Sequence, residues 1–158
     1  LLAQQDQLTE LNNKATFNTL AKKVLERQNN CLHALLMVDV DDFKDVNDCY
    51  GHAVGDQVLE QVAMELKERF RSRDIIGRGG GDEFTILMTD IPSKEVAIKK
   101  AGELCDTMNS SKFAKCDITV SIGIAFSDKT KSFDELYIES DEALYQAKNN
   151  GKNQFEAK

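Results

Sequence analysis

Residues 75 to 88 read IIGRGGGDEFTILM and combine the features of a β-hairpin with two adjacent acids. Two short apolar runs, 75–76 and 84–88, flank three consecutive glycines and two carboxylates. Apolar runs on both sides of a glycine-rich turn are typical of a β-hairpin. Consecutive glycines cost folding entropy and add no packing, so we interpret them as a turn whose backbone approaches an anionic ligand closely.

The apolar pattern outside the hairpin predicts the remaining elements. It predicts helices that start at the Asn13 cap and near residues 57, 93 and 133, strands at 31–38 and 118–126, and a short last strand near Phe155. The resulting order, α-β-α-β-β-α-β-α, contains the β-α-β-β-α-β arrangement of ferredoxin-like folds. We therefore expect an α+β fold with a ferredoxin-like, palm-type βαββαβ core, an antiparallel central sheet and flanking helices.

The composition is that of one globular domain. The chain has 158 residues, of which 41% are hydrophobic and 30% charged, and its first residue, Leu1, suggests a piece of a longer protein. A net charge of −7 argues against a basic surface for nucleic-acid polymers, although metals and a few lysines can still attract a phosphorylated ligand. No run resembles a membrane span or a secretory signal. The four cysteines lack zinc or redox spacing, which favours a cytoplasmic setting.

Carboxylates gather at two places that the predicted sheet can bring together. Asp39 ends a buried strand and should share a strand face with Asp41, whereas Val40 faces the other way. If the hairpin neighbours this strand, Asp82 and Glu83 converge with Asp39 into a site of hard oxygen ligands for Mg²⁺ or Mn²⁺. Such a cluster suits two-metal phosphoryl chemistry. A strand end that runs into a solvated acidic loop, and a hairpin with a solvated tip, are the structural alternatives.

The segment 43–56, FKDVNDCYGHAVGD, is predicted to be a polar loop. Its Asn47, Asp48 and Asp56 can present donors and acceptors to a purine edge, because a carboxylate accepts from guanine N1–H and N2–H₂. Such recognition discriminates strongly, since a wrong base leaves buried polar groups unpaired. Alternatively, Asp56 simply caps a helix that begins at Gln57.

Together these residues resemble a known family. The matching segments are DQLTELNNK (6–14), DVDDFKDVNDCYGHAVGD (39–56), RGGGDEF (78–84), TVSIGIA (119–125) and DEALYQAKNNGKN (141–153). The chain thus resembles the GGDEF family, the diguanylate cyclases, over residues 6–153. The resemblance implies that two GTP condense into cyclic di-GMP and two pyrophosphates. Each 3′-hydroxyl would attack the other's α-phosphate across a homodimer. Residues 13–158 would be the catalytic domain. Residues 1–12, with Leu1, Leu8 and Leu11, would be either the end of an incoming signalling helix or linker, or an ordinary packed or frayed terminus.

The resemblance also implies roles for single residues. Two Mg²⁺ or Mn²⁺ ions would be held in each active site, and Asp82 would help to deprotonate the 3′-hydroxyl. The implied set is Asp39, the Val40 carbonyl, Asp82 and Glu83 for metal, with Asp82 and Glu83 catalytic; Gly80 and Gly81 along the nucleotide; Asn47 and Asp56 at guanine; and Lys44, Lys148 and Lys152 at phosphates. Lys152 stands where the family commonly has Arg, which keeps the charge but loses the bidentate fork.

A second site is implied by R-x-x-D spacing before the motif. Arg71 and Asp74 match a site where the family binds its product as an inhibitor, although a charged helix terminus also explains Arg71. Glu103 stands near the position of a second arginine, so we expect weaker inhibition than usual.

Further departures from the family pattern lie near the hairpin and the N-terminus. Glu10 replaces a common Gly, Lys14 replaces Arg, and Gly79 replaces a bulkier residue. No role for Gly79 follows from the sequence.

Three functions compete. An inactive GGDEF domain could act as a GTP or cyclic di-GMP receptor, and a variant cyclase could use ATP for one GTP. The intact motif and Asp56 favour the GTP cyclase. We expect GTP, cyclic di-GMP, a second copy of the domain and an upstream regulatory domain as partners. We expect no membrane contact by this domain, even if the full-length protein is membrane-anchored.

Overall fold

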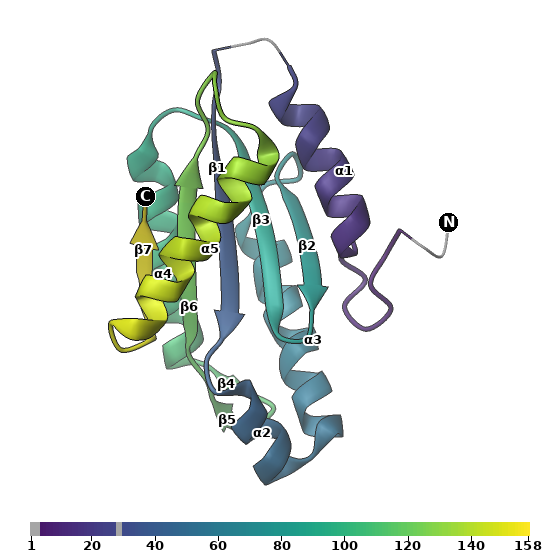
Figure 1. Ribbon diagram of the computed structural model, residues 1–158. Helices are drawn as coiled ribbons and strands as arrows, with labels where there is room; N and C mark the ends of the chain where they lie inside the picture. The colour runs from purple at the N-terminus through teal and green to yellow at the C-terminus, as the bar shows by residue number, and fades with distance from the viewer. Residues whose placement is uncertain (1–3, 28–29) are drawn as a thin grey trace.

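The central sheet carries the motif hairpin at one edge. The computed structural model describes residues 4–27 and 30–158 and contains a five-stranded sheet in the order β2-β3-β1-β6-β7 (Figure 1). Its strands are β1 (Leu32–Val40), β2 (Ile75–Gly80), β3 (Glu83–Ile91), β6 (Val120–Phe126) and β7 (Phe155–Ala157). Neighbours pair antiparallel except β6 and β7, which pair parallel. The predicted antiparallel βαββαβ core and the short last strand are confirmed.

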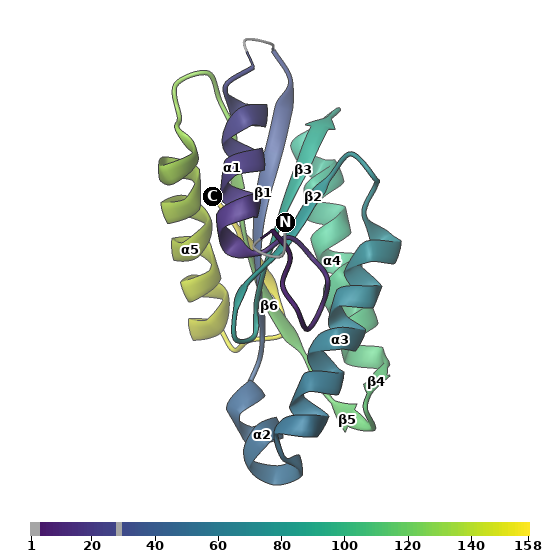
Figure 2. The same ribbon diagram turned by 90° about the vertical axis from the view of Figure 1, so that its right-hand side faces the viewer.

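Helices cover both faces of the sheet. They are α1 (Lys14–Leu25), α2 (Phe43–Tyr50), α3 (His52–Arg69), α4 (Lys94–Ser110) and α5 (Phe133–Asn149), and a small hairpin joins β4 (Lys112–Phe113) to β5 (Cys116–Asp117). Helices α1 and α5 lie on one face, and α3 and α4 on the other (Figure 2). Within the described residues, no helix combines the length and apolar character needed to cross a membrane.

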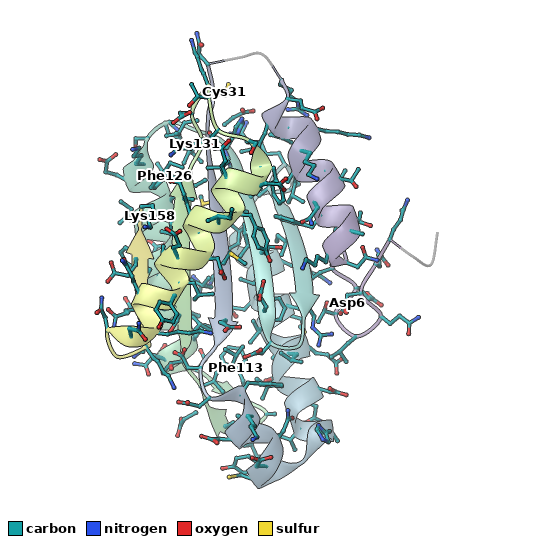
Figure 3. The ribbon with its side chains drawn as sticks, viewed as in Figure 1. Asp6, Cys31, Phe113, Phe126, Lys131 and Lys158 are labelled. Carbon is teal, nitrogen blue, oxygen red and sulfur yellow. The ribbon has the colours of Figure 1, made fainter. Side chains whose placement is uncertain are left out.

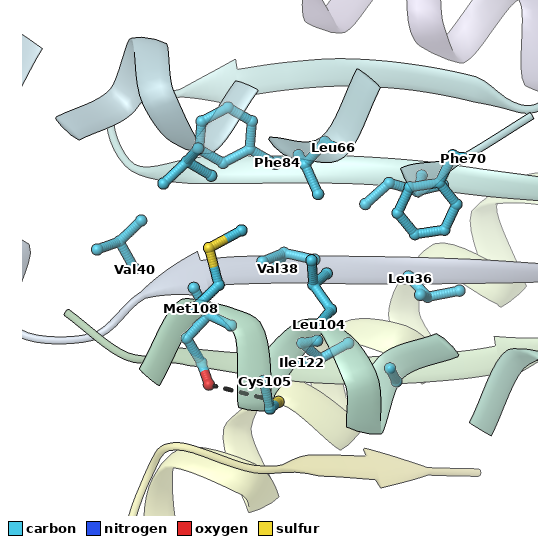
Figure 4. Packing of buried hydrophobic residues seen from close by; sticks show 14 of the residues in the cluster. Leu36, Val38, Val40, Leu66, Phe70, Phe84, Leu104, Cys105, Met108 and Ile122 are labelled. Atoms are coloured by element: carbon cyan, nitrogen blue, oxygen red, sulfur yellow. Dashed lines mark hydrogen bonds between the residues drawn. The ribbon is translucent and has the colours of Figure 1, made fainter. Parts of the chain in front are cut away.

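Strand β1 is buried on both faces, as its continuous apolar run predicts. Its Leu36 and Val38 belong to the larger core together with Leu66 of α3 and Leu104 of α4 (Figure 4). Leu35, one residue away and therefore on the opposite face, belongs to the smaller core beneath α1 and α5. Each such fully buried side chain contributes about 1.5–3 kcal/mol, so β1 anchors both layers.

The segment 43–56 is helical, and the predicted loop is wrong. Helix α2 ends at Tyr50, and α3 begins at His52 after Gly51, whose φ of 90° separates the two helices. Asp56 therefore lies inside α3 and is not the cap of a helix that begins at Gln57. Glycines and polar residues suggested a loop, but buried Val46 fixes α2 against the core. The Asn13 cap is confirmed, because its Oδ1 accepts from Thr16 N at 2.9 Å.

The three motif glycines occupy different backbone environments. Gly80 and Gly81 have φ of 107° and 54°, and a Cβ on either would meet open space. These two positions need glycine for its conformation. Gly79 is absent from the positive-φ residues and is the extra residue of a β-bulge, between the pairs Arg78–Phe84 and Gly80–Glu83. A Cβ there would lie 3.2 Å from Glu83 Oε1, so Gly79 provides space.

The described part of the N-terminal segment, residues 4–12, forms a turn against the hairpin and is not helical. Arg78 Nη1 donates to both oxygens of Asp6, at 3.0 and 3.2 Å, and its Nη2 donates to Gly81 O at 2.7 Å. Asn12 Nδ2 also donates to Ile76 O at 3.0 Å (Asp6 is labelled in Figure 3). The predicted boundary between residues 12 and 13 stays a prediction, while residues 4–12 help to hold the hairpin tip.

We expect Glu10→Gly to stabilise the domain. Glu10 has φ 63°, a conformation that is costly for any residue with a Cβ. Glycine removes this cost but adds entropy to the unfolded chain, so the net gain should be about 0.5–1 kcal/mol, with roughly 2–4 °C in Tm per kcal/mol. Thermal unfolding of Glu10→Gly beside Glu10→Ala, which keeps the Cβ, checks this. Equal Tm values for the two variants would contradict it.

Candidate active site

The strand register brings the predicted carboxylates together. Asp39 near the end of β1 is the cross-strand partner of Glu83 at the start of β3. Val40 N donates to Asp82 O at 3.2 Å, which ties the hairpin tip to the end of β1. The Asp39, Asp82 and Glu83 side chains therefore gather at one end of the sheet, which we call the carboxylate end.

The electrostatics of the carboxylate end reflect burial first and then the crowding of like charges. Burial and then the nearby Asp39 charge raise the pKa of both Asp82 and Glu83. Lys148 of α5 relieves part of this repulsion, because its ammonium pairs with Asp39 Oδ2. Although burial opposes the Lys148 charge, the bond to Asp39 and the charges of Asp39 and Asp82 raise the Lys148 pKa.

The donor set fits a hard divalent cation, although the side chains do not form a ready cage. Among residues 4–27 and 30–158, no three or more His, Cys, Asp or Glu stand where they could hold a metal ion. Asp39 is turned to the Lys148 ammonium, and Glu83 Oε1 accepts from Tyr137 O–H at 3.4 Å. Carboxylate oxygens suit Mg²⁺ or Mn²⁺, and a metal ion held by Asp39 would take the place of the Lys148 ammonium.

Asp41 lies apart from this cluster and has a structural role. It is buried, and it accepts from Thr119 Oγ1 at 2.7 Å, Ser121 Oγ at 2.6 Å and Asn153 N at 3.0 Å. These bonds join the end of β1 to β6 and to the loop after α5. Asp39 and Asp41, which the sequence predicted on one strand face, thus have different partners: Asp39 lies opposite Glu83, and Asp41 fixes the backbone around the end of β1.

The predicted phosphate lysines come from separate elements. Lys148 is in the last turn of α5, where its ammonium pairs with Asp39, and Lys152 follows in the loop, where its Nζ pairs with Asp42 Oδ1 at 2.6 Å. Lys44 is exposed in the first turn of α2, two residues after the Asp42 cap. Lys148 thus places its charge at the carboxylate end and Lys152 places its charge at Asp42, whereas the role of Lys44 at a phosphate stays a prediction.

The predicted guanine readers come from two different helices. Asn47 is in α2 and Asp56 in α3, and the Asn47 side chain packs on Gly55, directly before Asp56. A Cβ on Gly55 would lie 2.0 Å from Asn47 Oδ1. Gly55 therefore permits the close approach of the Asn47 side chain to α3, a reason for glycine that its position in the sequence did not reveal.

Arg71 and Asp74 contact each other. Asp74 is buried, and its Oδ1 accepts from Arg71 Nη2 at 2.8 Å and Thr89 N at 3.1 Å, while its Oδ2 accepts from Arg71 N at 2.9 Å. Arg71 Nη2 also donates to Thr89 O at 2.5 Å. Both Asp74 oxygens thus have partners, and the pair fastens the turn before β2 to β3. A role in product binding stays a prediction.

A hollow of about 560 Å³ lies at the other end of β1, lined by Cys31, His33 and Lys131 among others (Cys31 and Lys131 are labelled in Figure 3). His33 Nδ1 accepts from Asp90 N at 3.0 Å, and burial lowers the His33 pKa. The imidazole is therefore neutral and structural here. Since Asp39 ends the same nine-residue strand, this hollow is separate from the carboxylate end.

Comparison with known proteins places this geometry in a family. A family model described as "Diguanylate cyclase, GGDEF domain" matches residues 3–154. The chain belongs to this family. The GGDEF domain is 41% identical over 127 residues to the diguanylate cyclase DgcM of Escherichia coli K12, an alignment that covers 77% of this chain and 30% of DgcM. It is 37% identical over 156 residues to YtrP of Bacillus subtilis, covering 98% of this chain and 26% of YtrP.

A solved structure supports the same assignment. The coiled coil and GGDEF domain of DgcB from Caulobacter crescentus, in complex with c-di-GMP, match with a TM-score of 0.93 and 27% identity, covering 99% of this chain and 86% of that one. The chain spans about a quarter to a third of the length of DgcM and YtrP. The activity of a whole protein that contains this domain is therefore a matter for proposal.

We expect neutral variants of the carboxylate end to be more stable than the natural domain. The raised pKa values mean that the folded state holds these protons more tightly than the unfolded chain, so ionisation at neutral pH lowers stability. Asp82→Asn should therefore raise Tm at pH 7 and lose this advantage at a pH low enough to protonate Asp82. Thermal unfolding at several pH values measures this difference in Tm between Asp82→Asn and the natural domain. Asp48→Asn on exposed α2 is the control, and a lower Tm for Asp82→Asn at pH 7 would contradict the crowding.

Proposed function

We propose that this GGDEF domain is a diguanylate cyclase that condenses two GTP into cyclic di-GMP and two pyrophosphates. The observation that carries the proposal is the carboxylate end itself, where Asp39 pairs across strands with Glu83 beside the open Gly80–Gly81 turn. Partly buried carboxylates that repel one another are costly to a fold, and nucleotide chemistry gives them a use.

The proposed substrate contacts follow from position. Asn47 and Asp56 would read the guanine edge, and the side chain-free backbone at Gly80 and Gly81 would lie along the nucleotide. Lys44, Lys148 and Lys152 would bind phosphate oxygens, Lys148 after leaving Asp39 and Lys152 after leaving Asp42. Their lysine charges would act locally, which explains how a domain of net charge −7 attracts GTP.

The proposed chemistry assigns separate tasks to the carboxylates. Asp39 and Glu83, with the Val40 carbonyl and Asp82, would hold Mg²⁺ or Mn²⁺, which supplies Lewis-acid stabilisation of charge at the α-phosphate. Asp82, at the hairpin tip, would take the proton of the attacking 3′-hydroxyl. One domain offers one such site, whereas the product contains two GMP units. Two domains would therefore meet face to face, each presenting one GTP.

Product identification tests the proposal. We expect the purified domain with Mg²⁺ and GTP to form cyclic di-GMP, read by mass spectrometry, at protein concentrations that favour dimers. Glu83→Ala and Asp82→Ala should each lower the rate at least about 100-fold with folded-state circular dichroism unchanged.

Three outcomes separate the alternatives. GTP or cyclic di-GMP binding with no product at any protein concentration would support the receptor function and contradict the cyclase. A mixed cyclic dinucleotide as the main product from GTP and ATP would contradict the choice of GTP. Substantial turnover by Glu83→Ala would overturn the proposed metal site.

Product feedback at Arg71 and Asp74 is a second proposal and has its own test. We expect Arg71→Ala to raise the cyclic di-GMP concentration needed for half inhibition by about 10-fold or more, since a bidentate arginine contact to guanine is lost. Arg73→Ala, which removes an exposed neighbour, is the matched control. Unchanged inhibition in Arg71→Ala, with a lowered Tm, would leave Arg71 as a structural partner of Asp74 alone.

A further inference from the structure

Two residues outside the assigned site lie near the same carboxylate oxygen. Tyr137 of α5 donates its hydroxyl to Glu83 Oε1 at 3.4 Å. Gly79 leaves room for the same atom, because a Cβ at residue 79 would stand 3.2 Å from Glu83 Oε1 and 3.6 Å from Glu83 Cδ. Two residues that are 58 positions apart in the chain therefore limit the position of the Glu83 carboxylate.

The bulge at Gly79 explains how the space beside the Glu83 carboxylate arises. The extra residue in β2 lies opposite the step from Glu83 to Phe84, and bulges re-aim side chains beside functional sites. Since φ of Gly79 is outside the positive region, alanine could adopt this backbone. Its cost would come from pressing on the Glu83 carboxylate, in contrast to Gly80 and Gly81, where a Cβ meets nothing.

The surroundings of Tyr137 hold its hydroxyl in place. The Tyr137 ring packs on Phe133 with 6.0 Å between centroids, and the Lys14 ammonium lies 5.9 Å from the Tyr137 ring centroid. Burial, and then the Glu83 charge, raise the pKa of Tyr137 to about 12, so the hydroxyl keeps its proton and donates. Glu83 Oε2 accepts no hydrogen bond within the described part of the chain and is available to a ligand.

We propose that Tyr137 is a positioning residue that orients Glu83 for divalent metal, and that Gly79 provides the space for this orientation. The inference rests on the proposed function, in which Glu83 binds metal. Carboxylate ligands are commonly fixed by a hydrogen bond from a neighbouring group, and loss of that bond weakens metal binding by about 10–100-fold. The proposal gives Gly79 the role that the sequence left open.

The test is Mn²⁺ binding, followed by electron paramagnetic resonance, in the presence of 3′-deoxy-GTP, which lacks the attacking hydroxyl. Tyr137→Phe removes one oxygen and keeps the ring, and we expect about 10-fold weaker Mn²⁺ binding. Gly79→Ala should weaken it to a similar extent. Because both act through Glu83 Oε1, the double variant should lose less than the product of the single losses. Tyr145→Phe removes the same atom from an exposed tyrosine on the same helix and should bind as the natural domain does.

Kinetics separate positioning from general damage. We expect Tyr137→Phe to keep the KM for GTP, to lose kcat at limiting Mg²⁺ and to regain it at high Mg²⁺. The proposal would be overturned if Tyr137→Phe bound Mn²⁺ within about twofold of the affinity of the Tyr145→Phe control, since a tenfold loss is expected. The cyclase function would still stand in that case. A natural domain that neither binds Mn²⁺ nor forms cyclic di-GMP would overturn both.

Discussion

Antiparallel pairing of β1 with β3 sets Asp39 opposite Glu83, and the rest of the carboxylate end depends on this register. A shift by one residue would turn each side chain to the opposite face. The repulsion between these acids is relieved from a single helix, since α5 supplies both Lys148 for Asp39 and Tyr137 for Glu83. Helix α5 can lie close to the sheet because Gly123 of β6 has no side chain. A Cβ at that position would lie only 2.1 Å from Ser140 O of α5. Strand register and helix distance together place the charges.

The glycines of the motif show that one residue type can answer different constraints within three positions. Gly80 and Gly81 allow the positive φ values of a tight turn, whereas Gly79 leaves room for a carboxylate. Gly55 likewise leaves room for Asn47. At these two positions, the missing glycine side chain leaves the space that a neighbouring side chain occupies. Composition and hydrophobic periodicity do not reveal such a need for space.

The features that could be predicted from the sequence are those that local residue patterns control. Alternation of apolar runs and turns predicted the hairpin, the antiparallel core and the Asn13 cap, because these depend on neighbouring residues. The sequence predicted a loop at 43–56, because the short helix α2, the break at Gly51 and the first turn of α3 carry the same polar residues and glycines as a loop. The bonds of Asp41 and the contact of Tyr137 with Glu83 join residues far apart in the chain. They depend on three-dimensional packing, which one sequence alone does not specify.

The central claim is that the cross-strand pair of Asp39 and Glu83 is a divalent-metal site for a bound guanine nucleotide. The most direct measurement is anomalous diffraction from crystals of the domain grown with Mn²⁺ and 3′-deoxy-GTP. We predict anomalous peaks at about 2.0–2.6 Å from the carboxylate oxygens of Asp39 and Glu83, which is bonding distance. Lys148 should have moved from Asp39 to a phosphate oxygen. Bound nucleotide with no peak at these carboxylates and with the Lys148–Asp39 pair intact would contradict it.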